Sequence, residues 1–537
     1  MSTTKRSGIA KFGMALVASL LISTSIPGAA TAQVTAFKQA VAEYASDDRD
    51  LAAFYRDQTF GAVWIGADAV FTERRKALLN ALKSAESHGL SATRYDVDGL
   101  MAQMAAAKTS RDMGILDVEL SKAYLKYARD VQYGMLKPTT IDEGIKRKAP
   151  SRPALDYLTD LLAGDADQVM AELPPQSGEY PRLRKEMLRL QALMTRGGWG
   201  ETVSGKKLEP GDKGANVVKL RNRLVAMGYL TRTATQRYDA RIEAAVQQFQ
   251  TDHGLEADGV AGATTITELN VPVQKRLQSV LVAMERERWT NMERGDRHVL
   301  VNLTDYTAKI FDDGKVTFRT RSVVGQNVSD RRSPEFSDIM EHMIINPTWH
   351  VPRSIAVNEY LPMMKKNPNA AGHLRLVNGR GQSVSREGID FTQYTARTFP
   401  FDIKQPPSNR NALGLVKFMF PNKHNIYLHD TPAKNLFSRE TRAYSHGCIR
   451  LAQPFDFAYA LLAVQSDDPK GDFHRHLNTG RETKVDLVKK VPVHIIYRTA
   501  TVPAKGKANY RRDVYGRDAR VWNALQQAGV ALDAVSI

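Results

Sequence analysis

Residues 298–324 have the sequence HVLVNLTDYTAKIFDDGKVTFRTRSVV, in which apolar and β-branched residues gather on both sides of a short turn. The composition of 298–303 and 307–311 predicts two strands, and 316–324 continues the pattern. Residues 312–314 are Asp-Asp-Gly, the kind of turn that joins two hairpin strands. This stretch therefore predicts an antiparallel β meander.

Further strands are predicted downstream, at 338–345, 415–419, 425–429 and 493–497. Together they define a mainly antiparallel β domain over about 274–500. The polar segment of about 353–405 contains Pro362, Pro368 and several glycines, so we expect an insertion over one end of the sheet. An insertion near a site is a candidate lid.

The chain before this β domain is predicted to be helical over 33–205. Apolar residues recur there at spacings of three and four, which places one apolar stripe on a helix: Leu116, Leu120, Ala123, Tyr127 and Val131. Gly134 and Pro138 are expected to end that helix. The glycine-rich residues 197–205 are interpreted as a linker.

Residues 206–273 form a compact module of three predicted helices. Residues 210–214, PGDKG, open the first helix, and Gly228 closes it; Gly254 closes the second. Glycine suits these positions because a left-handed conformation costs it little. Residues 264–269 supply a third, short helix. The sequence as a whole thus predicts a multi-domain α+β fold, with 501–537 as a tail that ends in a helix.

Length and composition agree with several folded domains. At ~150 residues per domain, 537 residues suggest roughly three or four. Apolar residues make up 42% and charged residues 25%, which excludes a disordered or collagen-like chain. The formal charge of +17 favours an acidic partner, and wall polymer, nucleic acid or anionic lipid would each satisfy it.

Residues 1–32 are interpreted as a signal peptide. Lys5, Arg6 and Lys11 form a positive start, 12–26 is a short apolar stretch, and 30–32 is an A-x-A cleavage site. Removal of this segment takes away three positive and no negative charges, so the charge falls from +17 to +14. The signal peptide predicts export, and an exported protein is not expected to have a nucleic-acid partner. No later window has ~18 uninterrupted apolar residues, so we expect no membrane anchor.

Cys448 is the only cysteine in the sequence. A single thiol excludes an intramolecular disulfide and a multi-cysteine zinc cluster, which leaves a buried bystander or a reagent. Attack by sulfur on a carbonyl needs a thiolate, and a free thiol has a pKa of ~8.5, so a base or cation must lie nearby.

The residues around Cys448 offer such groups. The sequence of 426–432 is IYLHDTP and that of 444–450 is YSHGCIR, so His429 and His446 are the candidate bases. Gly447 would let the backbone approach a substrate oxygen, so that main-chain N–H groups could form an oxyanion hole. The same His429, His446 and Cys448 could be drawn as a zinc site, but no supporting acidic residue can be placed beside them. We therefore expect no metal and no cofactor.

The three-helix module resembles the type 1 peptidoglycan-binding domain. The motifs are GDKG..V..LR.RL...GYL, at 211–230, followed by YD..I..AV..FQ..HGL..DGV.G..T...LN. The resemblance implies docking on cell-wall glycan or stem peptide. The alternative is a spacer that holds the next domain away from the wall.

The β domain resembles L,D-transpeptidases with a YkuD-type catalytic domain. His429, fifteen further residues, and then Ser-His-Gly-Cys followed by Arg450 match the family signature. The motifs NP.W.VP.SI at 346–355 and NALG..KF.FPN at 411–422 are similar to the larger periplasmic members, which also carry a helical scaffold and a peptidoglycan-binding module. The resemblance implies a periplasmic, wall-associated enzyme.

The resemblance also implies roles for individual residues. Cys448 would be the nucleophile, His429 the proton acceptor and donor, and the Asp430 carbonyl would orient the imidazole. The remaining motif residues would shape the loop, the oxyanion hole and the substrate contacts: Tyr427, Ser445, His446, Gly447 and Arg450. For Arg450, a carboxylate clamp and a local ion pair both remain open. His446 need not take part in proton transfer.

The implied reaction is a two-step acyl transfer. A tetrapeptide stem donates its L-diaminopimelate carbonyl to Cys448 and releases D-alanine, and a diaminopimelate amine then takes the acyl group to give a 3→3 cross-link. Carbapenems would acylate the same cysteine. The alternatives are an L,D-carboxypeptidase or endopeptidase on the same fold, and a non-catalytic wall-binding protein.

Overall fold

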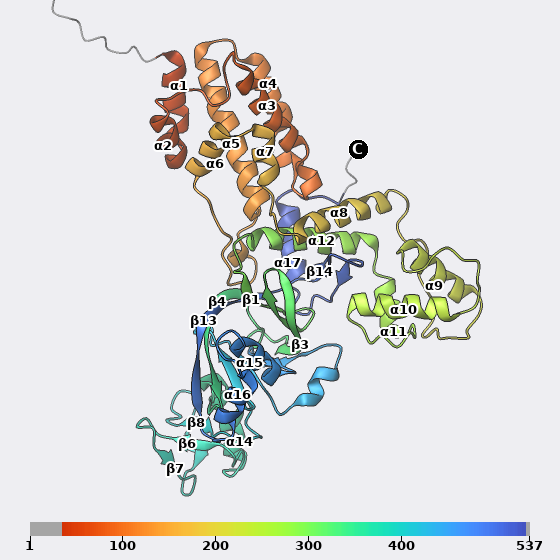
Figure 1. Ribbon diagram of the computed structural model, residues 1–537, viewed down its shortest axis with the longest axis vertical. Helices are drawn as coiled ribbons and strands as arrows, with labels where there is room; N and C mark the ends of the chain where they lie inside the picture. The colour runs from red at the N-terminus through yellow and green to blue at the C-terminus, as the bar shows by residue number, and fades with distance from the viewer. Residues whose placement is uncertain (1–34, 533–537) are drawn as a thin grey trace, which may run out of the picture.

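The computed structural model describes residues 35–532, so the predicted signal peptide lies outside the described residues. Figure 1 shows a helical bundle at one end of the long axis and a β domain at the other, with a layer of helices between them. A small helical module projects sideways from this middle layer. The predicted multi-domain α+β fold is confirmed.

The bundle is built from α1 (Ala36–Ala45), α2 (Arg49–Asp57), α3 (Ala69–Lys83), α4 (Val97–Ala106), α5 (Ser110–Tyr133), α6 (Ala154–Ala163) and α7 (Ala166–Glu172). Its longest helix, α5, begins at a capping box in which Thr109 and Asp112 satisfy each other's backbone N–H groups. The predicted apolar stripe faces the bundle core, and α5 ends before Gly134, whose φ is 97°. Short 3₁₀ turns lie at Ala85–His88, Ala92–Arg94 and Pro138–Thr140.

The middle layer consists of α8 (Glu179–Met194), α12 (Val273–Trp289) and α17 (Arg517–Gln527). These helices share one hydrophobic cluster, separate from that of the bundle, which includes Leu190, Leu281 and Val521. The hairpin β14 (Ala500–Thr501) and β15 (Asn509–Tyr510) joins the same cluster. The C-terminal helix thus packs into the junction between the bundle and the β domain.

The side module contains the three predicted helices, α9 (Ala215–Ala226), α10 (Ala240–His253) and α11 (Ala263–Leu269). Gly228 and Gly254 follow the first two helices with φ of 77° and 69°, the left-handed conformation that glycine adopts readily at helix C-termini. The three helices enclose a small core that includes Leu220, Val246 and Phe249. The predicted three-helix architecture is confirmed.

The main sheet of the β domain has nine strands in the order β11-β3-β12-β10-β9-β4-β13-β1-β2. Because β2 also pairs with β3, the sheet closes on itself. Six neighbouring pairs are antiparallel, including the closing pair β2–β3, while β13–β1, β12–β10 and β11–β3 are parallel. The strands are β1 (Arg297–Asn302), β2 (Thr307–Asp312), β3 (Lys315–Gly325), β4 (Phe336–Ile345), β9 (Val416–Met419), β10 (Leu428–His429), β11 (Ala443–Ser445), β12 (Ile449–Leu451) and β13 (Thr483–Ile496).

Two strands differ from the sequence-based boundaries. The expected strand over 425–429 shrinks to Leu428–His429, because Asn422 accepts from the N–H groups of His424 and Ile426 and holds that stretch as a turn. The expected strand over 493–497 starts ten residues earlier, at Thr483, and its register shifts between Asp486 and Val491. Exposed charged residues there hide the β alternation. Helices α15 (Pro454–Leu462) and α16 (Pro469–Leu477) cover this sheet.

The segment between β4 and β9 forms a cap with its own hydrophobic cluster. Its four strands lie in the order β5-β8-β6-β7: β5 (Trp349–His350), β8 (Asp402–Gln405), β6 (Arg375–Val377) and β7 (Ser383–Val384). Three consecutive helical pieces complete it, α13 (Arg353–Ile355), a π-helix (Ala356–Tyr360) and α14 (Leu361–Lys366), and 3₁₀ turns lie at Phe391–Gln393 and, outside the cap, Lys434–Ser438. The cap lies at the far end of the β domain (Figure 1).

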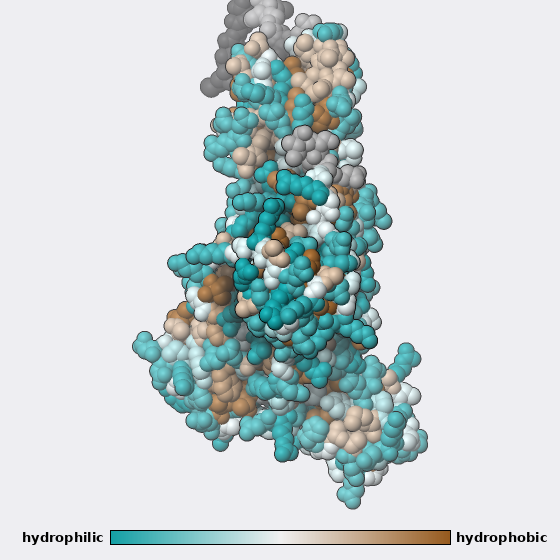
Figure 2. All heavy atoms as spheres, turned by 90° about the vertical axis from the view of Figure 1, so that its right-hand side faces the viewer, coloured by the Kyte–Doolittle hydropathy of each residue, from teal (hydrophilic) through white to brown (hydrophobic). Residues whose placement is uncertain are grey.

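The outer surface is mostly polar. In Figure 2, hydrophilic residues dominate the face that the side module presents, and hydrophobic residues occur in small groups. Among residues 35–532, no helix combines the length and the apolar character that crossing a membrane requires.

Candidate active site

A cavity of about 710 Å³ lies between the cap and the open end of the main sheet. The cap contributes Trp349, Ile355 and Glu359 to its wall, among others. The sheet side contributes the residues that the sequence singled out: Tyr427, His429, Ser445, His446, Cys448 and Arg450. The tertiary fold therefore brings the predicted nucleophile and the predicted base to one cavity.

The position of Cys448 follows from the strand pairing. It lies between β11 and β12, and β12 runs parallel to β10, with Ile449 opposite Leu428 and Arg450 opposite His429. Because Arg450 lies opposite His429, the two side chains share one face of the sheet, and Cys448, two residues before Arg450, lines the same cavity. The Cys448 Sγ lies 3.5 Å from the carbonyl oxygen of Asn425.

The loop that carries Cys448 is fixed by hydrogen bonds within it. Ser445 Oγ donates to the Cys448 carbonyl oxygen over 2.5 Å and accepts from the Gly447 N–H over 3.2 Å. Ser333 Oγ donates to the Gly447 carbonyl oxygen over 2.6 Å. Gly447 has φ of 114°, which a side chain would strain. Hydrogen bonds within the protein thus hold the loop in this conformation without a substrate.

This arrangement separates two backbone donors. The Gly447 N–H is already bonded to Ser445, whereas the Cys448 N–H has no hydrogen-bond acceptor within residues 35–532. Gly447 therefore contributes its backbone shape, and the Cys448 N–H is the donor left free for a substrate oxygen.

His429 is buried, at 4% exposure, and its orientation is set by its neighbour. Its Nδ1 lies 2.5 Å from the Asp430 carbonyl oxygen. A carbonyl only accepts, so Nδ1 carries the proton and Nε2 remains the free base. The Asp430 carboxylate is occupied elsewhere: it accepts from the Leu415 and Thr431 N–H groups and pairs with Lys434. Asp430 therefore holds the histidine through its backbone and the strand end through its side chain.

Burial controls the protonation of the pair. It raises the pKa of the Cys448 thiol to about 11, against opposing contributions from Tyr427 hydrogen bonds and the positive charges of Arg450 and Lys417. Burial, followed by the charge of Arg450, lowers the pKa of His429 to about 3. At neutral pH the resting pair is therefore a thiol beside a neutral imidazole, which suits proton transfer to His429 as sulfur attacks.

This resting state predicts a level pH profile. His429 keeps its base form above a pKa of about 3 and Cys448 keeps its proton below a pKa of about 11. We therefore expect kcat/KM for acylation of Cys448 to change little between about pH 5 and pH 9. Stopped-flow acylation across this range measures it. An acid limb centred near pH 6.5 would contradict the assignment, because it would indicate a thiolate–imidazolium pair.

Arg450 presents an uncompensated guanidinium to the cavity. Its Nε is buried without a hydrogen-bond partner, and burial lowers its pKa. The sequence left two interpretations of Arg450 open, a carboxylate clamp and a local ion pair. In the part of the chain that the structure describes, no carboxylate forms an ion pair with Arg450. A buried cation without a carboxylate favours an acidic ligand.

Two residues near the site, Glu359 and Lys417, were not predicted from the sequence. Glu359, on the π-helix of the cap, accepts from His446 Nε2 over 2.7 Å and pairs with Arg331 over 2.8 Å. The His446 side chain is thus turned toward the cap. Lys417, opposite His429 on β9, lies with its Nζ 5.9 Å from the centre of the Tyr427 ring. Only the motif NALG..KF.FPN could have pointed to Lys417, and no spacing signal marks Glu359.

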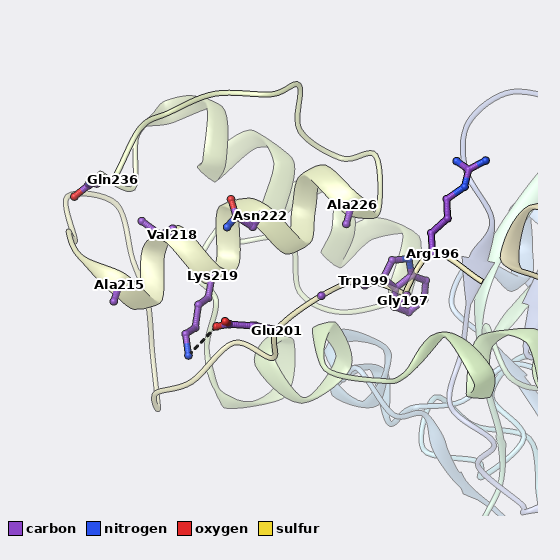
Figure 3. Close-up of a pocket in the computed structure, with 12 residues that line it drawn as sticks. Arg196, Gly197, Trp199, Glu201, Ala215, Val218, Lys219, Asn222, Ala226 and Gln236 are labelled. Carbon is purple, nitrogen blue, oxygen red and sulfur yellow. Dashed lines mark ion pairs between the residues drawn. The ribbon is translucent and has the colours of Figure 1, made fainter. Parts of the chain in front are cut away.

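A second cavity, of about 770 Å³, lies in the side module (Figure 3). One face of α9 forms its floor, and the glycine-rich residues 196–201 form the opposite wall. Lys219 and Glu201 pair across it over 3.2 Å, and Trp199 lies near the end where the linker leaves the module. Within residues 35–532, no three His, Cys, Asp or Glu side chains are grouped to hold a metal ion.

In comparison with known proteins, three segments of the chain match family models. Residues 49–187 match the family model of the "Scaffold domain", 213–269 that of the "Putative peptidoglycan binding domain" and 296–493 that of the "L,D-transpeptidase catalytic domain". A curated protein of Haemophilus influenzae named "Putative L,D-transpeptidase" is 29% identical over 244 residues, which are 45% of this chain and 48% of that protein. The match thus spans about half the length of this relative.

Two solved structures are also similar. Both are L,D-transpeptidases. The one from Xylanimonas cellulosilytica is 13% identical with a TM-score of 0.17, and 55% of this chain and 100% of that chain are covered. The one from Stackebrandtia nassauensis is 16% identical with a TM-score of 0.22, over 55% and 97% of the two chains. Residues 296–493 thus match the model of the L,D-transpeptidase (YkuD) catalytic domain, in one chain with matches to a scaffold domain and a peptidoglycan-binding domain.

Proposed function

We propose that this protein is a peptidoglycan L,D-transpeptidase that uses Cys448 to form 3→3 cross-links in the cell wall. The observation that carries the proposal is the cavity under the cap, where the only thiol, a neutral histidine and an unpaired arginine meet. These three groups match the needs of acyl transfer from a substrate that carries carboxylates.

In the first step, a tetrapeptide stem presents its L-diaminopimelate–D-alanine bond to Cys448. Sulfur attacks the carbonyl carbon as His429 Nε2 takes the thiol proton, and the free Cys448 N–H donates to the developing oxyanion. His429 then gives this proton to the departing D-alanine amine, and a thioester remains. Arg450 is the cation that would hold a donor carboxylate.

In the second step, a diaminopimelate amine of a neighbouring stem attacks the thioester carbon. His429 takes a proton from the amine and returns it to sulfur, which leaves as the thiol. The energy of the broken peptide bond is retained in the thioester, so no nucleotide is needed. With water in place of the amine, the same steps give an L,D-carboxypeptidase.

The remaining parts of the proposal concern location and binding. The charged, apolar and A-x-A segments of residues 1–32 support export to the periplasm. The peptidoglycan-binding domain supports association with the wall, through glycan or stem peptide. A carbapenem, whose strained carbonyl suits attack by a thiol, is expected to acylate Cys448.

The products of one reaction separate the proposal from its alternatives. Purified full-length protein is incubated with disaccharide-tetrapeptide, and the products are separated and sequenced by tandem mass spectrometry. We expect free D-alanine and dimers joined between two diaminopimelate residues. Tripeptide without dimers would establish a hydrolase instead, and unchanged substrate would establish a non-catalytic wall-binding protein.

A further inference from the structure

A groove of about 540 Å³ lies on the side of the Cys448 loop that faces away from the cap. It shares four lining residues with the cavity under the cap: Asp330, His424, Ile426 and His446. Gly447, next to the nucleophile, also lines it. The two cavities therefore adjoin at the loop that carries Cys448, one on the cap side and one on the side of the middle layer.

One wall of this groove comes from outside the catalytic domain. Residues 141–146, which follow α5 of the bundle, form one part, and Arg517 and Arg520 at the start of α17 form another. Neither segment lies within 296–493, the residues that match the catalytic family. This groove exists only when the whole chain is assembled.

The 141–146 wall is fixed firmly to the sheet. The Lys146 N–H donates to the Glu335 carbonyl oxygen over 2.9 Å, and the Glu335 N–H donates to the Gly144 carbonyl oxygen over 2.8 Å. Arg147, the next residue, donates to Ser337 over 2.7 Å. Gly144 lies so close to Arg517 that an added Cβ would be 1.8 Å from its guanidinium. The wall is therefore a built part of the groove.

The groove carries unpaired charges of both signs. Asp142 forms ion pairs with Arg517 and Arg520. By contrast, Glu143, Lys146 and Asp330 are exposed, and no ion pair engages them within residues 35–532. A ligand with an ammonium and a carboxylate close together would satisfy both signs at once.

We infer that this groove binds the acceptor stem peptide, with Lys146 facing its carboxylate and Glu143 and Asp330 facing its amine. The inference rests on the proposed function. The free end of diaminopimelate bears an amine and a carboxylate on one carbon, which is the zwitterion that the groove fits. The donor occupies the cap side, so an acceptor that enters from the opposite side reaches the thioester without displacing the cap.

The step that this subsite serves is the second one. The acceptor nitrogen forms a bond to the thioester carbon and the carbon–sulfur bond breaks. One proton passes from nitrogen through His429 to sulfur. The acceptor binds as the ammonium and must lose one further proton to solvent before it attacks. Lys146, Glu143 and Asp330 are positioning residues that raise the local concentration of this amine over water.

The test substitutes charged residues of the groove and measures the ratio of thioester consumed by the acceptor amine to thioester hydrolysed by water. Lys146→Ala and Glu143→Gln are made in the full-length protein, with Lys148→Ala as the charge-matched control, since Lys148 is also exposed but does not line the groove. Disaccharide-tetrapeptide is the substrate. We expect the ratio of dimer to hydrolysed tripeptide to fall about three- to tenfold in both groove variants, with KM for acceptor raised, and to stay unchanged in Lys148→Ala.

Thioester formation, followed by intact-protein mass spectrometry, separates this inference from the proposed function. If the unsubstituted protein forms no thioester, the proposed function fails. If the unsubstituted protein forms thioester and dimers, and Lys146→Ala and Glu143→Gln give the same ratio of dimer to tripeptide, only the inference of an acceptor site is refuted. A slowing of thioester formation equal to the loss of dimer would also overturn it, because the groove would then serve the donor.

Discussion

Cys448→Ala is expected to remove covalent acylation entirely. Unsubstituted protein incubated with a carbapenem should gain the mass of one drug molecule, and with disaccharide-tetrapeptide the mass of one acyl group. The alanine variant should gain neither, because Cys448 is the only thiol in the chain. Loss of an essential nucleophile typically lowers the rate by about 10⁴-fold or more. Intact-protein mass spectrometry and D-alanine release measure both effects.

Cys448→Ser is the matched control for this experiment. Serine keeps the size and the loop hydrogen bonds, but its hydroxyl is a far weaker nucleophile beside an imidazole whose pKa burial lowers to about 3. We expect it to be almost as inactive as alanine, with an unchanged melting temperature. An adduct on the alanine variant would show that another residue is acylated and would refute the assignment of Cys448.

Glu335→Ala is expected to have the largest effect on stability. Glu335 is buried at the junction of the β domain and the middle layer, where its two carboxylate oxygens pair with Arg286 over 2.6 Å and Arg517 over 3.3 Å. Removal leaves two buried guanidinium groups short of negative charge. Breaking a buried ion pair from one side typically costs about 3–5 kcal/mol, so we expect the free energy of unfolding to fall by about that amount.

The measurement combines thermal unfolding with hydrogen exchange at the junction. Protection should fall first at the Lys146 amide, which donates to the Glu335 carbonyl, and less in the helical bundle. Glu341→Ala is the control: Glu341 lies on β4, the strand that begins directly after Glu335, but its partner Lys490 is exposed, so little change is expected. Equal melting temperatures for the two variants would show that the buried network does not hold the junction together.

Much of the fold was predictable because its signals are local. Each of these signals acts within a few residues: the stripe on α5, the glycines after α9 and α10, and the Asp-Asp-Gly turn between β2 and β3. The boundaries of β10 and β13 were not predictable. One depends on the Asn422 turn and the other on pairing with β4, a strand more than a hundred residues earlier.

The site divides in the same way. The single thiol, its candidate bases His429 and His446, and the glycine before it all follow from the amino-acid sequence alone. The tertiary structure distinguishes the two histidines, because their chemistry depends on orientation: the Asp430 carbonyl leaves His429 Nε2 free, while Glu359 holds His446 toward the cap. It also brought Glu143 and Lys146, some three hundred residues from Cys448, to the far side of the loop. Such contacts come from packing between domains, which no local pattern in the sequence encodes.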